Sequence, residues 1–246
     1  LSLIPVLLFF GKLNLSDIVS YQAANGWLLL PFWNEGGTVI HAGYWQNSLQ
    51  QWLLLLPMGI SFFVFTTSIF AETNRMPFDL PECETELVGG YHTEYSSMKF
   101  ALFFMGEYAA MIVGSALIVT IFFGGWSLGF GLDSALLQTA GGDWKWYAGL
   151  IHMGAFLTKT VAFIIFFIWV RSTVPRFRYD QLMKLGWVVF FELALFNIFL
   201  AALIMAAPHI GILNTFLFGI PALVVTALMM FFITKTNEVK RKAKIT

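Results

Sequence analysis

The stretch Leu193–Thr234, LALFNIFLAALIMAAPHIGILNTFLFGIPALVVTALMMFFIT, runs for 42 residues without an Asp, Glu, Lys or Arg. A helix needs about 20 apolar residues to cross the roughly 30 Å hydrocarbon core of a bilayer, so this stretch has the length of two spans. The sequence Pro208-His209-Ile210-Gly211 near its middle is typical of a break between helices. It therefore predicts two membrane helices joined by a short turn.

The same pattern recurs along the chain, which has no charged residue between Glu35 and Glu72 or from 108 to 132. Of 246 residues 58% are apolar and 11% charged, against roughly a quarter charged in soluble proteins, which excludes a water-soluble globule. We expect an all-α integral membrane protein, a multi-span helical bundle that forms a single transmembrane domain over 1–246. Five complete spans are expected near 49–70, 99–123, 147–170, 185–207 and 211–233.

The first ten residues, Leu1–Phe10, are apolar but too short to cross a membrane, and they lack the basic front of a signal peptide. We interpret them as the end of a sixth span, which predicts that the chain is the carboxy-terminal part of a longer subunit. The next segment, near Leu15–Val19, suggests a short helix at the membrane interface.

The distribution of Lys and Arg predicts the orientation. The segments 71–99, 171–184 and 234–246 together carry eleven basic residues, against Lys12 and Lys145 on the opposite side. Because basic loops stay in the cytoplasm, we expect 71–98 to be a cytoplasmic loop and 234–246 a basic cytoplasmic tail that also meets anionic lipid.

The cytoplasmic segment 71–98 is unusually acidic. Its carboxylates are Glu72, Asp79, Glu82, Glu84, Glu86 and Glu94, beside only Arg75 and His92. Crowded carboxylates that are partly removed from water titrate as a coupled set, as a proton relay requires. A solvated acidic loop explains the same composition, so the charges alone leave both interpretations open.

Three ionisable residues lie inside predicted spans, where each costs at least ~2.5 kcal/mol near the centre of a lone helix. Glu107 lies about two turns into its span and has no compensating charge among its sequence neighbours, which predicts a protonated carboxyl group unless a cation approaches. Lys159 is expected either to reach the interface or to pair with a carboxylate. Glu192 lies close enough to the start of its span to reach the interface.

Several other kinds of site are excluded by the sequence. The single Cys83 does not allow a disulfide, a Cys-ligated iron–sulfur cluster or a Cys-type zinc site within this chain. The histidines are scattered over different segments, no Gly-rich nucleotide fingerprint is present, and the zero net charge gives no field for nucleic acid. We expect no catalytic residue, metal ligand or covalently bound cofactor in this chain.

Two long motifs carry a specific resemblance. The run ETNRMPFDLPECETELVGGYHTEYSSMKFALFFMGEY, from Glu72 to Tyr108, and the run RSTVPRFRYDQLMKLGW, from Arg171 to Trp187, strongly resemble the quinone-site membrane subunits of respiratory complex I. This family occurs in bacterial NADH–quinone oxidoreductase and in its mitochondrial counterpart. The last third of the chain fits it less well, since 211–233 looks like an extra carboxy-terminal helix.

The resemblance implies a role for individual residues. Quinone is the substrate, and Arg75, Phe78 and Asp79 would line the inner part of its passage. Glu82, Glu84, Glu86, Glu94, Glu107 and Lys159 would take part in proton or charge coupling. Arg171, Arg176, Arg178, Tyr179 and Asp180 would form the loop that contacts the peripheral arm.

The resemblance also implies partners and location. The partners would be the iron–sulfur and quinone-site peripheral subunits, the small and antiporter-like membrane subunits, and membrane lipid. A bacterial inner membrane is expected rather than a mitochondrial one. Two alternatives are the related subunit of an ion-translocating hydrogenase and a secondary ion transporter, although the chain shows no internal repeat or paired helix breaks of the kind common in transporters.

Overall fold

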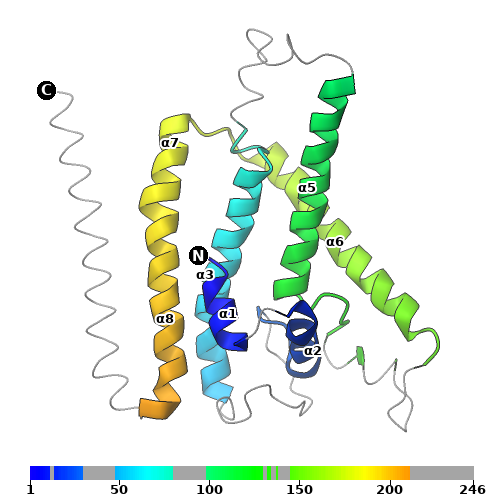
Figure 1. The fold of residues 1–246 in the computed structure, drawn as a ribbon, viewed down its shortest axis with the longest axis vertical. Coiled ribbons are helices and arrows are strands. Elements are labelled where there is room, and N and C mark those ends of the chain that lie inside the picture. Colours follow the sequence, from blue (N-terminus) through cyan, green and yellow to red (C-terminus); the bar gives the residue numbers. More distant parts are fainter. Residues whose placement is uncertain are drawn as a thin grey trace, which may run out of the picture.

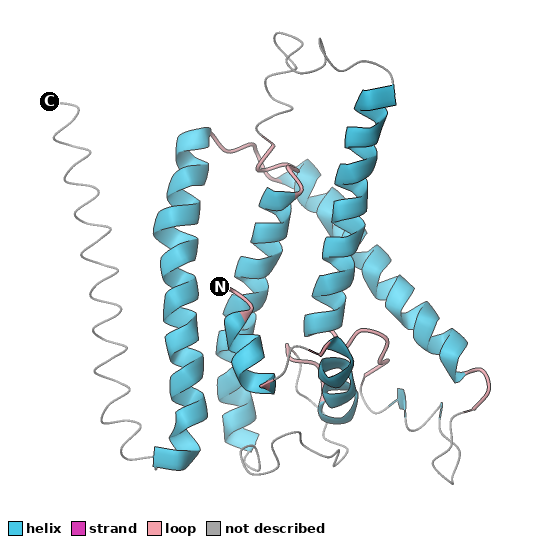
Figure 2. Ribbon diagram, in the orientation of Figure 1, coloured by secondary structure: helices cyan, strands magenta, loops and turns pink. Residues whose placement is uncertain are grey.

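The computed structural model describes residues 1–11, 14–29, 48–79, 98–129, 132–133, 137 and 145–210. Over these ranges the chain forms helices and loops and contains no strand, as Figures 1 and 2 show. The helices in chain order are α1 (Ile4–Phe10), α2 (Leu15–Asn25), α3 (Ser48–Glu72), α5 (Met98–Phe122), α6 (Ala148–Thr173), α7 (Tyr179–Lys184), the π-helix η3 (Leu185–Phe190) and α8 (Phe191–Ile210). The prediction of an all-α membrane bundle is confirmed.

Four helices in the described ranges are long and apolar enough to cross a membrane. They comprise Leu55–Glu72 of α3, all of α5, all of α6, and Tyr179–Met205, which runs through α7, η3 and α8. α1 and the segment Leu15–Ala23 of α2 could form a fifth, broken span, because they pass the same test together across a bend of 71°. The predicted span 211–233 lies outside the described residues.

The boundaries of the helices follow from local chemistry. α6 ends at Thr173 because Val174 precedes Pro175 and takes an extended conformation, with φ −98° and ψ 130°. The next helix begins at Tyr179, six residues earlier than the predicted span 185–207. Hydropathy locates the apolar part of a helix, whereas the polar turns of α7 continue the same helix beyond it.

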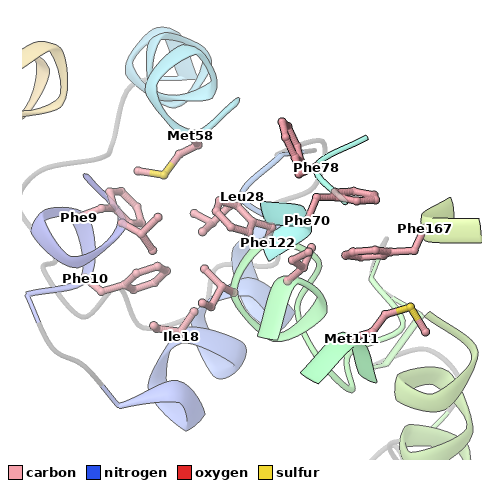
Figure 3. Packing of buried hydrophobic residues seen from close by; sticks show 13 residues of the cluster. Phe9, Phe10, Ile18, Leu28, Met58, Phe70, Phe78, Met111, Phe122 and Phe167 are labelled. Atoms are coloured by element: carbon pink, nitrogen blue, oxygen red, sulfur yellow. The ribbon is translucent and has the colours of Figure 1, made fainter. Parts of the chain in front are cut away.

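Successive long helices run in opposite directions. The loops that follow α3 and α6 therefore lie at one end of the bundle, and the described parts of the connection between α5 and α6 lie at the other end (Figure 1). α3 packs against α1, α5 and α8, while α5 packs against α2 and α6. Phenylalanine side chains from several helices fill the core (Figure 3), among them Phe10, Phe70, Phe122 and Phe167. Phe70 of α3 stacks on Phe167 of α6, with 4.0 Å between ring centroids.

Two polar or small residues set the close contacts of α3. A Cβ atom added at Gly114 of α5 would lie 2.6 Å from Cγ2 of Ile69, so the two helices approach too closely for a larger residue. Asn197 of α8 is buried and donates hydrogen bonds to the carbonyl oxygen of Pro57 (3.0 Å) and to Oγ of Ser61 (2.8 Å). Small residues and interhelical hydrogen bonds of this kind are what hold membrane helices together.

Candidate functional site

The loop that follows α3 turns back over the end of the bundle. Thr73 donates its hydroxyl to the carbonyl oxygen of Ile69 at 2.9 Å, which completes the last helical turn. Asn74 has φ +47°, a left-handed conformation that asparagine tolerates better than most residues, and it reverses the chain. The Phe78 amide then donates to the Arg75 carbonyl at 2.8 Å. This turn directs Arg75 toward α5.

Arg75 is buried between α3 and α5, with 5% of its surface exposed. Its Nη2 lies 3.8 Å from Oε2 of Glu107, and its guanidinium carbon lies 4.4 Å from the centroid of the Tyr108 ring. Arg75 is therefore the approaching cation that the sequence left open for Glu107. The neutralising cation comes from the loop after another helix, 32 positions earlier in the chain, so sequence neighbours could not reveal it.

Two nitrogen atoms of Arg75 have no hydrogen bond within the described part of the chain. They are Nε and Nη2, and both are buried. At 3.8 Å the contact between Nη2 and Glu107 is an ion pair without a hydrogen bond. Buried donors without an acceptor cost free energy, so a ligand oxygen that accepts from Arg75 would be favoured at this position.

Phe78 and Asp79 lie in the same loop and are both buried, with 5% and 3% of their surfaces exposed. The Phe78 ring stacks on Phe177, with centroids 5.7 Å apart and an interplanar angle of 24°. The three predicted quinone-binding residues are thus all buried in one short loop, and Phe78 forms an aromatic pair with Phe177.

This loop is joined to the segment between α6 and α7. The Phe177 amide donates to the Pro77 carbonyl at 3.0 Å, and Nε of Arg176 donates to Sδ of Met76 at 3.1 Å. The segment predicted to contact the peripheral arm is therefore packed directly on the segment predicted to bind quinone. Phe177, Met76 and Tyr108 were missed because a motif shows which residues occur but not which distant side chains meet.

The remaining residues of the second motif are arranged by α7. The Arg178 amide donates to Oε1 of Gln181 at 3.1 Å, and Asp180 lies in the first helical turn, where a negative charge is favoured. Arg178, Tyr179 and Asp180 are exposed at the start of the helix, whereas Arg171 and Arg176 are partly buried. Their predicted contact with a peripheral arm stays a prediction.

Lys159 lies far from this end of the bundle. Its Nζ donates hydrogen bonds to the carbonyl oxygens of Phe123 (2.8 Å), Gly125 (3.2 Å) and Ser127, all just beyond the end of α5. At 1.5 Å per residue this position is roughly 24 Å along α5 from Glu107. The two expectations for Lys159 were that it reaches the interface or pairs with a carboxylate. These backbone acceptors were not part of either expectation, and both stay predictions.

The acidic residues Glu82, Glu84, Glu86 and Glu94 lie outside the described residues, so their predicted coupling role is not tested. Over the ranges that are described, no group of three or more His, Cys, Asp or Glu residues could hold a metal ion. The site consists of a buried guanidinium, a half-buried carboxylate and an aromatic pair, which suits binding of a planar ring with polar substituents or movement of charge.

Comparison with known proteins shows the family of the chain. The family model for NADH dehydrogenase matches residues 1–202. The chain belongs to the NADH dehydrogenase family. It is 45% identical over 203 residues to the H subunit of NADH-quinone oxidoreductase from Rickettsia africae, which covers 82% of this chain and 49% of that protein.

Two further members of the family are similar to the chain to nearly the same degree. It is 42% identical over 183 residues to the NADH-quinone oxidoreductase H subunit numbered 1 of Cytophaga hutchinsonii, across 74% of this chain and 52% of that protein. It is 43% identical over 207 residues to the NADH-quinone oxidoreductase H subunit numbered 2 of Koribacter versatilis, across 84% of this chain and 49% of that protein. The chain therefore spans about half the length of the curated relatives that it matches.

The family match includes both motifs and ends within α8. Arg75, Glu107, Lys159 and the segment 171–187 all fall inside residues 1–202, whereas the predicted span 211–233 does not. The resemblance found in the two motifs is confirmed. The predicted carboxy-terminal span lies outside the part of the sequence that the family model matches.

Proposed function

We propose that this chain is part of the quinone-site membrane subunit of a proton-translocating NADH–quinone oxidoreductase. Membership of the NADH dehydrogenase family and the names of the relatives support this assignment. The single structural observation that carries it is the buried Arg75, which links the loop beside the aromatic pair to Glu107 inside α5.

Arg75, Phe78 and Asp79 would form the inner wall of a quinone passage. A quinone ring needs an apolar slot with a few polar groups that fix its orientation. The stacked rings of Phe78 and Phe177 supply apolar surface, and the buried Nε of Arg75 supplies a donor for a quinone carbonyl oxygen. This chain's own part is then to bind and orient the quinone, while the electrons come from a redox centre elsewhere in the complex.

Glu107 would connect quinone binding to charge movement. The carboxylate lies 3.8 Å from the same guanidinium that would bind the quinone, and its side chain is 26% exposed. A change in what Arg75 contacts alters the field at Glu107 and hence the preference of that carboxyl group for its charged form. We propose that Glu82, Glu84, Glu86, Glu94 and Lys159 belong to the same coupling system.

The start of α7 would contact the rest of the complex. Arg178, Tyr179 and Asp180 present both charge signs and an aromatic ring at the surface, which suits a polar protein interface. With Arg171 and Arg176 they would receive the peripheral iron–sulfur and quinone-site subunits. The small and antiporter-like membrane subunits and lipid would cover the apolar helices in a bacterial inner membrane.

The substitution Arg75→Ala tests this function. It should lower NADH-driven quinone reduction while NADH oxidation by an artificial acceptor that bypasses the quinone site stays largely intact. Lys99→Ala is the matched control, because Lys99 is a cation on the first turn of α5 but is exposed. Equal loss of both activities, or quinone reduction unchanged in Arg75→Ala, would contradict the proposed role.

A further inference from the structure

The chain makes an unusual turn at the end of α5 opposite Glu107. The Phe123 and Gly125 amides both donate to the Val119 carbonyl at 3.0 Å, which closes the helix. Gly124 and Gly125 have φ of +69° and +52°, a left-handed conformation that glycine adopts without strain. The turn lets the carbonyl oxygens of Phe123, Gly125 and Ser127 converge. We call these three oxygens the carbonyl cage.

One ammonium group donates to the whole cage. Nζ of Lys159, which projects from α6, forms a hydrogen bond with each of the three oxygens. A primary ammonium has three N–H donors and no acceptor, so its hydrogen-bonding capacity is fully used. This arrangement explains how a lysine is accommodated inside a long apolar helix, since a buried ammonium without partners would be very costly.

Three other features favour a cation in the cage. The indole ring of Trp27 lies 4.4 Å from Nζ, within the range of a cation–π interaction. The carbonyl cage lies at a helix C-terminus, where the peptide dipoles give partial negative charge. A carboxylate also lies beside the turn, since Oδ1 of Asp133 accepts from the Leu128 amide at 3.1 Å.

The indole ring is itself held in place by the turn. A Cβ atom added at Gly124 would lie 2.7 Å from Cδ1 of Trp27, and one added at Gly129 would lie 2.8 Å from Cε2. The side chain of Gln22 in α2 donates to the Ile121 carbonyl at 2.8 Å, which fixes α2 against α5. The carbonyl cage, from the end of α5, and the ring, from the loop after α2, therefore form a built site that receives Lys159 from α6.

We propose that the carbonyl cage and the Trp27 ring form a binding site for a primary ammonium group, and that Lys159 is its tethered ligand. The site joins the loop after α2, the end of α5 and the middle of α6, and it does not depend on the proposed quinone chemistry. If Lys159 is shortened, the vacated site should accept a small ammonium ion from solution. A guanidinium should fit poorly, because its five donors point outward in one plane instead of converging on three oxygens.

The test uses Lys159→Ala in the full-length subunit, within its assembled complex in detergent. The readout is the temperature at which half of the subunit precipitates, measured by immunoblot after heating. We expect a drop of about 6 °C or more, the range for losing charge-assisted hydrogen bonds in a chain of this size. Thr158→Ala is the matched control, because Thr158 is the exposed neighbour and bonds only within its own helix, to the Gly154 carbonyl at 2.8 Å.

Added ammonium or methylammonium should restore at least half of the loss in Lys159→Ala and should leave the unsubstituted protein unchanged. Tetramethylammonium, sodium and potassium should not restore it, because they have no N–H donors. Lys159→Arg should fall below the unsubstituted protein although it keeps the charge. If Lys159→Ala does not accumulate, methylammonium in the growth medium should raise its level and tetramethylammonium should not.

The proposal would be overturned by unchanged stability of Lys159→Ala or Lys159→Met. It would also be overturned by equal rescue with sodium or potassium, or by no rescue with any ammonium ion. A Lys159→Arg variant as stable as the unsubstituted protein would show that charge alone is required and that the carbonyl cage has no preference for an ammonium.

Discussion

Replacing Glu107 with Gln should destabilise the protein because it leaves Arg75 buried beside a neutral group. At the observed 3.8 Å, an effective dielectric constant of about 20 gives an attraction of about 4 kcal/mol between the two charges. Removing one partner of a buried pair typically costs about 3–5 kcal/mol. Glu107 is 26% exposed, so water replaces part of the lost interaction, and we expect a loss of about 2–3 kcal/mol for Glu107→Gln.

A double-mutant cycle isolates the pair from other effects of the substitution. Glu107→Gln, Arg75→Met and the double variant are compared by thermal unfolding in detergent, followed through the fluorescence of the 9 tryptophans. The expected loss corresponds to a fall in unfolding temperature of about 4–12 °C for a chain of this size. The free energy lost in the double variant should be smaller than the sum of the two single losses by about 1–2 kcal/mol. Losses that add to within about 0.3 kcal/mol would refute an energetic link between Arg75 and Glu107.

Three further predictions follow from the packing and the topology. Gly114→Ala should lower the free energy of unfolding by about 1–3 kcal/mol through its clash with α3, whereas Gly106→Ala, where an added Cβ meets nothing within 4 Å, should not; equal effects on the unfolding temperature would contradict the close helix contact. Asn197→Ala should cost about 0.5–2 kcal/mol through the lost bonds to α3, and an unfolding temperature within error of the unsubstituted protein would argue against them. In a Cys83→Ser background, a cysteine at Tyr179 should react with an impermeant thiol reagent only from the cytoplasmic side and one at Trp146 only from the other; the reverse pattern would invert the predicted orientation.

The sequence predicts the long helices well because membrane insertion depends on apolar length, and length is visible in one dimension. α3, α5 and α6 run over 48–72, 98–122 and 148–173, close to the ranges 49–70, 99–123 and 147–170 that hydropathy selects. The helix that contains the predicted span 185–207 already begins at Tyr179, because the polar turns of α7 carry no hydropathy signal. The π-helix at Leu185–Phe190 also has no counterpart in the apolar pattern.

The sequence points to individual residues of the candidate site but not to the contacts between them. The resemblance singles out Arg75, and the cost of an ionisable group in an apolar span singles out Glu107, but their pairing depends on how α3 and α5 are placed in space. The partners of Lys159 were hidden for a different reason. They are main-chain oxygens made available by glycine conformations in a turn, and side-chain identity does not reveal such acceptors.

The central claim is that Glu107 carries the effect of quinone chemistry into the membrane, and paired rate measurements on the same vesicles test it most directly. Quinone reduction and vesicle acidification are recorded for the complex containing Glu107→Gln, with both rates normalised to the amount of assembled complex. Gln keeps the shape and hydrogen bonding of a protonated carboxyl group but cannot ionise. We expect both rates to fall together, because in a tightly coupled complex quinone reduction and proton translocation depend on each other. Oxidation of NADH by an artificial acceptor should be retained. Full rates of quinone reduction and acidification in the assembled Glu107→Gln complex would contradict the claim.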